Sequence, residues 1–346
     1  MQMERRNIWE AGEYGYPLAL GFEPNLMVYL EEEKGSGADD MSQGSAKEKK
    51  PVMLVVPGGG YCFASPTEGG IVAKRFTDME YQTFVLTYTT NPLMAVPLED
   101  QPMRDLSRAI RHIRKHAEVY GIDPDRLAIC GFSAGAHLCG SVCVHYRDVA
   151  EENPDYAAYS CRPDAAILSY PVITSGAYAH QGSFQALVGK DIEERTQKLR
   201  EYFSLERHVT SETPPCFIWQ TVPDATVPVE NSYLFAEACK KQGVPYSHHV
   251  FSYGWHGLSL ADDTFTAGDF GDPYPMEQMV RTLEAARNDT LPVFISEEEK
   301  AEFLEENKGI VAHVCRKISE EFWMPEVAMW PYLAEKWLAC QWKSKE

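Results

Sequence analysis

Apolar residues occur along this chain in two patterns, short continuous runs and longer stretches with helical spacing. The run Pro51–Val56 (PVMLVV) has the length and composition of a strand that is buried on both faces of a sheet. In the stretch 98–120 the apolar residues instead return every three or four positions, as on one face of a helix. That face carries Met103, Leu106, Ile110 and Ile113. The chain is therefore expected to contain both buried strands and amphipathic helices.

The two kinds of segment alternate through most of the sequence. Further strands are expected at Asn25–Leu30, Thr83–Tyr88, Arg126–Cys130, Asp164–Ser169, Cys216–Gln220 and Ser247–Ser252. Helices are expected at 68–80, directly after Cys130, at 229–241 and around the closing tryptophans Trp330, Trp337 and Trp342. Such alternation predicts the α/β class, with a mostly parallel sheet that is built by right-handed crossovers and flanked by helices.

We interpret residues 1–346 as a single α/β domain with three interruptions. Residues 31–50 are charged and rich in Gly and Ser, and they predict a flexible surface loop. The stretch 171–215 is irregular and too long for an ordinary connection, so we expect it to form a cap over the carboxyl edge of the sheet. A second insertion, at 262–322, carries helical patterns of its own.

Composition and charge narrow the classes of partner. Hydrophobic residues make up 44% of the chain, enough for a substantial core. Lys and Arg number 32 against 51 Asp and Glu, and the resulting charge of −19 repels phosphate backbones and anionic lipid. We therefore expect neither nucleic acid nor a membrane as partner. No apolar run is long enough to span a bilayer, the N-terminus lacks the apolar stretch of a secretory signal, and the nine cysteines form no regular framework. These features predict a cytoplasmic location.

The motif GFSAG at residues 131–135 follows a predicted strand and opens a predicted helix. A serine in that context sits on a tight turn, and the small residues beside it allow the backbone to approach closely. The alternative is a glycine-rich turn without chemistry, since a pattern this short also arises by chance. Its placement between strand and helix favours a nucleophile elbow with Ser133 as the nucleophile.

Acyl transfer at such a serine needs hydrogen-bond donors for the oxyanion that forms. The glycine run after strand Pro51–Val56 can supply the backbone N–H groups of Gly59 and Gly60, and Ala134 can supply a third at the start of the helix. A glycine-rich loop can also bind phosphate, but the G-K-[ST] that would accompany it is absent from the sequence here. The pattern favours an oxyanion hole.

The partners of the serine are expected in the order acid, then histidine, each at the carboxyl end of a later strand. Asp224 follows one predicted strand and His256 follows the next. The alternatives are a turn or N-cap carboxylate for Asp224 and a structural role for His256. The order of the residues favours a Ser133–His256–Asp224 triad.

Other histidines are weaker candidates for a metal-binding or catalytic role. His112 and His116 stand four residues apart on a predicted helix and could in principle bind a metal ion, but the sequence supplies neither a third ligand nor an H-E-x-x-H pattern. His248 and His249 lie inside a predicted strand, where only one of them can face the catalytic edge. We predict no metal and no other cofactor.

Four blocks of sequence together resemble a known family. PGGGY, DPDRLAICGFSAGAHL, PDATVPVENS and GWHGLSLA are similar to the esterase branch of α/β-hydrolases that includes bacterial acetyl xylan esterases and bifunctional feruloyl and acetyl xylan esterases. The similarity runs from about residue 25 to 261 and resumes near the last helix. It implies the α/β-hydrolase fold and the same triad and oxyanion residues. Many relatives have His-Gly-Gly-Gly at the glycine loop, whereas this chain has Pro57 in place of the histidine, so the loop must be supported differently.

The resemblance and the residues together predict a serine carboxylic-ester hydrolase that acts on small acyl esters, with acetyl groups on xylan-type carbohydrate as the expected substrate. Tyr61 and Trp255 are expected to offer an apolar face to a sugar ring, although a core position suits each of them equally well. Two alternatives stay open, a serine peptidase of the same fold and a hydrolase-like binding protein without activity. The expected partner is a small-molecule or oligosaccharide ester, and the sequence leaves the natural ester and the oligomeric state open.

Overall fold

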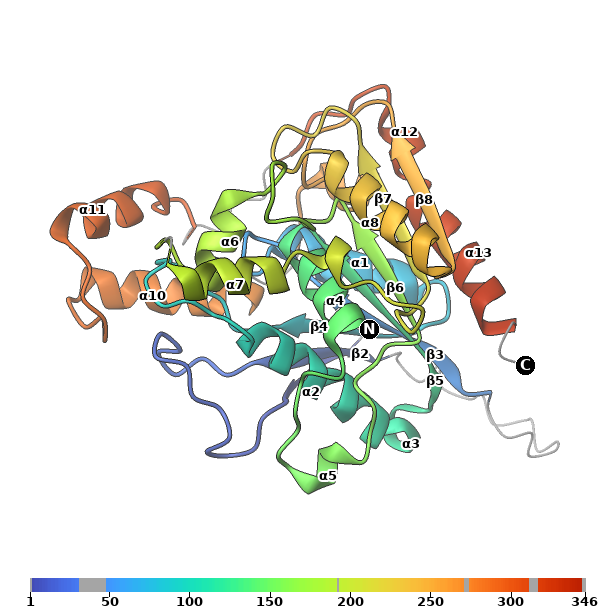
Figure 1. The fold of residues 1–346 in the computed structure, drawn as a ribbon, viewed down its shortest axis with the longest axis horizontal. Helices are drawn as coiled ribbons and strands as arrows, with labels where there is room; N and C mark the ends of the chain where they lie inside the picture. Colours follow the sequence, from blue (N-terminus) through green and yellow to red (C-terminus); the bar gives the residue numbers. More distant parts are fainter. Residues whose placement is uncertain (1, 31–47, 192, 271–273, 311–316, 344–346) are drawn as a thin grey trace.

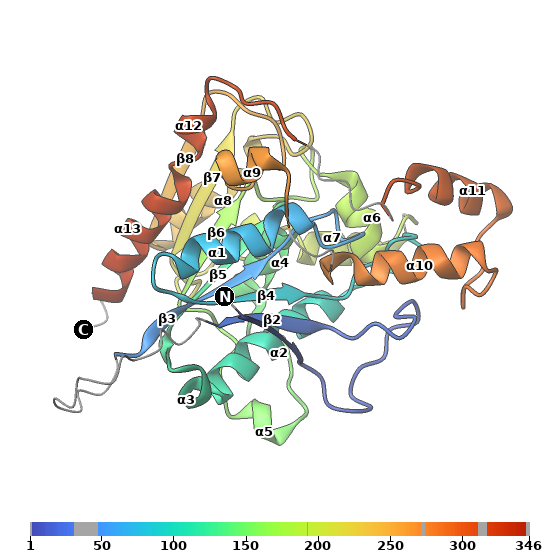
Figure 2. The ribbon, with the colours of Figure 1, turned by 180° about the vertical axis from the view of Figure 1, so that it is seen from behind.

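One twisted sheet of eight strands runs through the centre of the molecule (Figures 1 and 2). The computed structural model describes residues 2–30, 48–191, 193–270, 274–310 and 317–343. The strands are β1 (Gln2–Asn7), β2 (Asn25–Leu30), β3 (Lys50–Val56), β4 (Gln82–Thr87), β5 (Ile122–Phe132), β6 (Ala165–Ser169), β7 (Cys216–Thr221) and β8 (Tyr246–Phe251). They lie in the order β1-β2-β4-β3-β5-β6-β7-β8; β1 pairs antiparallel with β2 and β2 with β4, and the other neighbouring strands pair in parallel. The predicted mostly parallel sheet is confirmed.

Strand β3 shows why the sheet is covered on both faces. Val52, Leu54 and Val56 alternate with Met53 and Val55, and the two sets belong to two separate apolar cores. Side chains of a strand point to opposite faces in turn, so a continuous apolar run needs an apolar layer on each side. The pattern of β3 thus requires helices above and below the sheet.

The helices supply these two layers (Figures 1 and 2). One core is completed by α2 (Gln101–Lys115), α4 (Ala134–His145) and α8 (Glu230–Gln242), and the other by α1 (Gly70–Thr77), α12 (Met324–Val327) and α13 (Trp330–Lys343). The helix predicted for 98–120 is divided into α2 and α3 (Ala117–Tyr120), because the backbone leaves helical geometry at His116. The short helix α5 (Pro154–Ala157) packs beside α2.

The two predicted insertions carry helices of their own. The segment 171–215 contains α6 (Gln181–Val188), α7 (Glu194–Tyr202) and the 3-10 turn η2 (Leu205–Arg207). The segment 262–322 contains α9 (Asp263–Ala267), the 3-10 turn η3 (Tyr274–Met276), α10 (Glu277–Arg287) and α11 (Glu297–Glu306), and α10 and α11 extend at one side of the molecule (Figure 1). The division of the chain into these parts stays a prediction. Most of the loop predicted at 31–50 lies outside the described residues.

Residue Gln278 anchors helix α10 to the body of the molecule. Its Nε2 donates to the carbonyl groups of Thr90 and Leu18, at 2.7 and 3.2 Å, and its Oε1 accepts from the Thr90 N–H at 2.8 Å. Helix α11 packs in turn against α10 through Phe303 and Leu283. In the part of the chain that the structure describes, no helix is both long and apolar enough to cross a membrane.

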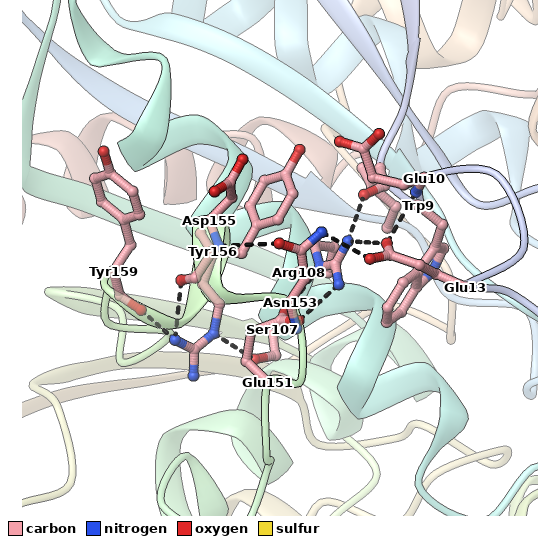
Figure 3. Close-up of polar contacts among 12 residues, drawn as sticks. Trp9, Glu10, Glu13, Ser107, Arg108, Glu151, Asn153, Asp155, Tyr156 and Tyr159 are labelled. Atoms are coloured by element: carbon pink, nitrogen blue, oxygen red, sulfur yellow. Dashed lines mark hydrogen bonds and ion pairs between the residues drawn. The ribbon is translucent and has the colours of Figure 1, made fainter.

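A buried arginine fastens the segment after β1 to helix α2 (Figure 3). Arg108 is 2% exposed, and it pairs with Glu13 and Glu151 at 2.6 Å each. The rings of Trp9 and Tyr156 lie over its guanidinium carbon at 4.3 and 4.4 Å. We call these five residues the N-terminal clamp. Two carboxylates and two ring faces together compensate for taking the arginine out of water.

Candidate active site

Ser133 stands on a strained turn between β5 and α4. Its φ of +53° is unusual for a residue with a side chain, and its N–H donates to the Ser169 carbonyl group at 3.0 Å. The glycines of the motif explain how the turn closes, since a Cβ on Gly131 would lie 2.4 Å from the carbonyl oxygen of Gly135, and one on Gly135 would lie 2.2 Å from that of Val56. The tight turn predicted from GFSAG is present.

Ser133, His256 and Asp224 meet at the carboxyl ends of β5, β8 and β7. The His256 Nε2 lies 2.8 Å from the Ser133 Oγ, and the His256 Nδ1 lies 2.7 Å from the Asp224 Oδ2. A carboxylate only accepts hydrogen bonds, so Nδ1 carries the proton and Nε2 is free to accept from the serine hydroxyl. The other Asp224 oxygen accepts from the N–H groups of Thr226 and Val227 at 2.9 Å, which fixes the carboxylate in this orientation.

The glycine loop lies directly against the serine. A Cβ on Gly58 would stand 2.6 Å from the Phe132 carbonyl oxygen and 2.9 Å from the Ser133 Cβ, so this position has no room for a side chain. Gly59 and Gly60 have φ values of +120° and +64°, and these bend the loop back on itself. Ala134 is the first residue of α4, where an N–H has no acceptor inside the helix. The three predicted oxyanion donors therefore belong to segments beside Ser133, and their role stays a prediction.

Glu68 supports the glycine loop in place of the missing histidine. This residue ends the 3-10 turn η1 (Pro66–Glu68) and is 3% exposed. Its Oε2 accepts from the Gly58 N–H at 2.7 Å, and its Oε1 accepts from the Tyr170 hydroxyl at 2.7 Å. Burial raises the pKa of the Glu68 carboxyl, and its two hydrogen bonds and the charge of His256 act in the opposite direction. Sequence analysis identified neither Glu68 nor Tyr170.

His180 is a further neighbour of the site that sequence analysis missed. It caps α6, because its Nδ1 accepts from the Ser183 N–H at 3.3 Å, and its Cε1 lies 4.0 Å from the position that a Cβ on Gly60 would take. Burial lowers the pKa of His180, and the charge of His256 lowers it further while Asp224 raises it. The segment predicted as a cap thus brings a histidine to the edge of the glycine loop.

The two predicted aromatic contacts differ in position. The Tyr61 side chain is 1% exposed and its hydroxyl contacts the His137 Nδ1 at 2.7 Å, so its ring belongs to the core and the expected sugar contact does not fit. The Trp255 side chain is 41% exposed next to His256 and packs edge-on against Trp323 at 5.0 Å. It belongs to an exposed aromatic surface that we define as Tyr253, Trp255 and Phe322, and the buried Trp323 packs against Trp255.

The four other histidines that the sequence singles out have ordinary surroundings. The rings of His112 and His116 lie 4.3 Å apart, and burial lowers the pKa of His112 to about 4. The Nε2 atoms of His248 and His249 contact the hydroxyl groups of Ser232 and Ser247. Among the residues with described positions, no group of three or more His, Cys, Asp or Glu side chains could hold a metal ion.

A family model and several known proteins match this chain. The BD-FAE family matches residues 40–239. The chain is 50% identical over 277 residues to the endo-1,4-beta-xylanase B of Butyrivibrio fibrisolvens and 31% identical over 214 residues to an acetylxylan esterase of Xylanibacter ruminicola, which covers 80% and 60% of this chain. The chain spans 41% of the length of each of these relatives.

A solved structure resembles most of this chain. The acetyl ester-xyloside bifunctional hydrolase of Caldicellulosiruptor lactoaceticus is 33% identical to this chain with a TM-score of 0.66, and the match covers 83% of this chain and 97% of that one. A carboxylesterase of Lactobacillus plantarum, at 21% identity and a TM-score of 0.62, has the same fold over 99% of this chain. The fold predicted from the sequence, that of the α/β-hydrolases, is confirmed.

Proposed function

The chain belongs to the BD-FAE family, and from this premise we propose that it is a serine esterase that removes short acyl groups, acetyl foremost, from xylan-type carbohydrate. The observation that carries the proposal is the pair of contacts that join Ser133, His256 and Asp224, at 2.8 and 2.7 Å. Hydrogen-bond contacts of this length suit proton transfer from a nucleophile to a base that a carboxylate orients.

The reaction has two steps. In the first, the His256 Nε2 takes the proton of the Ser133 hydroxyl while the Oγ attacks the ester carbonyl, and the imidazolium then protonates the leaving alcohol. In the second, His256 activates a water molecule that cleaves the acyl-enzyme and releases the acid. Asp224 holds the imidazole in the tautomer that both steps require, because Nδ1 keeps its proton on the Oδ2.

The oxyanion that forms in each step needs donors on the side of Ser133 that faces the glycine loop. The N–H groups of Gly59, Gly60 and Ala134 serve as these donors. The support for this assignment is the close approach of Gly58 to Ser133 and the free first turn of α4. Fixed donors of this kind stabilise the developing charge without any reorganisation when the reaction occurs.

A carbohydrate substrate is supported by the exposed aromatic surface beside His256. Trp255 directly precedes the catalytic histidine in the chain and its ring is exposed, and aromatic rings suit the apolar face of a sugar. The Xylanibacter relative is named an acetylxylan esterase and the Caldicellulosiruptor structure an acetyl ester-xyloside bifunctional hydrolase, and both names agree with this substrate. The Butyrivibrio relative is named for cleavage of the xylan chain, but this chain spans 41% of it.

Replacement of the nucleophile tests the reaction. We expect Ser133→Ala to remove nearly all hydrolysis of p-nitrophenyl acetate and all labelling by a fluorophosphonate probe. Ser141→Ala is the matched control, because Ser141 lies in the same helix and donates to the His137 carbonyl group away from the site. A wild-type rate in the Ser133 variant would contradict the assignment. An unlabelled wild-type protein would support a binding protein without activity.

Comparison of substrates tests the class. We expect acetylated xylo-oligosaccharides and aryl acetates to be cleaved, and aminoacyl nitroanilides and aryl xylosides to remain intact. Cleavage of the nitroanilides alone would favour the peptidase. Trp255→Ala is expected to raise the KM for acetylated oligosaccharides by about tenfold, the loss of one ring contact of about 1 kcal/mol or more, while the KM for p-nitrophenyl acetate changes little.

A further inference from the structure

We propose that Glu68 is a positioning residue of the active site, whose ionised carboxylate holds the glycine loop and the loop after His256 in the geometry that catalysis needs. The proposal rests on the proposed esterase function. Glu68 contacts neither Ser133 nor the expected position of the substrate. It acts through Gly58 on one side and through Tyr170 on the other.

The direction of each hydrogen bond in this network is fixed. The Gly58 N–H can only donate, and it donates to the Glu68 Oε2. The Ser259 N–H donates to the Tyr170 hydroxyl oxygen at 3.1 Å, so the hydroxyl proton is left for the Glu68 Oε1. Both carboxyl oxygens therefore face donors. A protonated Glu68 would turn its hydrogen atom toward one of these two donors and lose that hydrogen bond, whereas the ionised form accepts from both.

The network joins segments that are far apart in the sequence. Gly58 follows β3, Tyr170 follows β6, and Ser259 lies three residues after His256. Ser259 is held in addition by its own hydroxyl on the Thr67 carbonyl group, at 2.6 Å, and by the indole of Trp330 on its carbonyl group, at 2.8 Å. A single carboxylate thus fixes the distance between the glycine loop and the histidine loop.

The two ends of the network, Gly58 and Tyr170, lie against Ser133 and His256 respectively. A Cβ on Gly58 would lie 2.9 Å from the Glu68 Oε2 and also 2.9 Å from the Ser133 Cβ, so the loop fits tightly between the two. The Tyr170 ring packs edge-on against the His256 ring at 4.9 Å. Loss of the carboxylate would therefore release the oxyanion loop and the imidazole together, and a misplacement of about 1 Å is enough to slow catalysis.

The charge of Glu68 adds to its geometry. Among the described residues, no Lys or Arg forms an ion pair with it, although its carboxyl is fully buried. The titratable groups that interact electrostatically with its charge are Tyr88, Cys130, Tyr170 and His256. Of these four, only the imidazole can become positive. An unneutralised carboxylate behind the site attracts the imidazolium that forms when Ser133 loses its proton, and so favours the transition state.

Three variants test the proposal on the full chain. Glu68→Gln keeps the shape of the side chain but turns an NH₂ group toward one of the two donors, and Tyr170→Phe keeps the ring on His256 but removes the hydroxyl. We expect kcat for p-nitrophenyl acetate to fall about 10- to 100-fold in Glu68→Gln and about tenfold in Tyr170→Phe, with KM nearly unchanged. The double variant should be no slower than Glu68→Gln, because both changes break one network.

Asp105→Asn is the matched control. Asp105 is also a fully buried carboxylate without a salt bridge among the described residues, but its partners are Trp9, Thr89 and Gln101. We expect this variant to unfold at lower temperature and to keep the wild-type kcat. A purely structural Glu68 would behave in the same way, so a folded Glu68→Gln protein with wild-type kcat would overturn the proposal.

The rate of Ser133 labelling by a fluorophosphonate separates this proposal from the esterase function on which it rests. Labelling measures the reactivity of Ser133 whether or not an acetate is the natural substrate. We expect labelling to slow in parallel with kcat in both variants. If wild-type protein labels but cleaves no acetate, the esterase proposal fails, and slow labelling of Glu68→Gln still supports the positioning role. Should Glu68→Gln fail to fold, wild-type labelling of Tyr170→Phe would overturn it.

Discussion

Two regions of the molecule bury charged side chains, and they compensate for burial in different ways. In the N-terminal clamp, Arg108 faces two glutamates and lies between two aromatic rings, and the neighbouring Asp105 accepts four hydrogen bonds. Behind the active site, Glu68 has two donors and no cation among the described residues. Arg108 and Asp105 each have several partners, whereas the Glu68 carboxylate has one hydrogen-bond donor for each of its oxygen atoms.

The difference shows what each region contributes. In the clamp, the Arg108 guanidinium pairs directly with both carboxylates, and the contacts serve mainly to fasten the segment after β1 to α2. The Glu68 carboxylate is not cancelled, and its field reaches His256. Removing a clamp residue should therefore affect stability, whereas changing the glycine loop or Glu68 should affect the rate.

The largest effect is expected from Arg108→Ala, which leaves Glu13 and Glu151 without their partner. We expect the free energy of unfolding in urea to fall by about 3–5 kcal/mol, with kcat of the folded protein unchanged. Arg104→Ala is the control, because Arg104 lies over the same Trp9 ring at the longer distance of 5.7 Å. Its loss should cost about 1 kcal/mol or less. Equal losses in the two variants would contradict a special role for Arg108.

Gly58→Ala is expected to have an effect of similar free energy, here on the reaction rate instead of on stability. The new methyl group would overlap the Phe132 carbonyl oxygen and the Ser133 Cβ, and the loop must move away from the nucleophile. We expect kcat to fall about 100- to 1000-fold, as after loss of an oxyanion donor. At Gly15 a side chain would meet no heavy atom within 4 Å, so Gly15→Ala should retain the wild-type rate. Esterase assays of the two proteins decide whether the contact matters.

Asp105→Asn should show an intermediate effect on stability, about 1–3 kcal/mol, because an amide cannot accept all four hydrogen bonds. Burial raises the pKa of Asp105 to about 6, above its value of 3.8 when exposed. The folded protein thus binds this proton more tightly than the unfolded chain, and the stability that protonation supplies is lost as the pH rises toward and through 6. Relative to the variant, wild-type stability should fall by about 1 kcal/mol between pH 5 and 7. A constant difference would contradict the raised pKa.

The smallest effect is expected from Trp9→Phe, which keeps an aromatic ring over Arg108 but removes the indole N–H that donates to Asp105. We expect a loss of about 1 kcal/mol in the free energy of unfolding. In the Asp105→Asn background the same change should cost less, because the acceptor is already altered. Fully additive losses in urea unfolding would show that Trp9 and Asp105 act separately.

The sequence predicted the sheet well because buried parallel strands carry continuous apolar runs, as β3 does. It missed β1, whose residues QMERRN have no apolar run and whose strand is held by backbone pairing with β2. The triad residues were predictable because each stands just after the carboxyl end of a predicted strand, and the structure brings all three together. Their catalytic roles stay a proposal.

The supporting residues were not predictable in the same way. In the sequence, Glu68 is a charged residue at the start of a predicted helix, which is an ordinary solvated position. Only the fold brings the Tyr170 hydroxyl to it. Tyr61 follows the glycine loop and so looked accessible. Its φ of +64° turns the chain back, and the ring enters the core beside His137. Long-range contacts of this kind leave no local pattern.

Strand β1 has a consequence for how the protein behaves at high concentration. It is the outermost strand at its end of the sheet, and it covers β2, whose residues NLMVYL are mostly apolar. The charged residues Glu4, Arg5 and Arg6 form a barrier on that edge, since an incoming strand would have to bury them. Without these few residues, β2 would offer its backbone and its apolar side chains to the next molecule, so the least buried strand is the one that keeps neighbouring molecules apart.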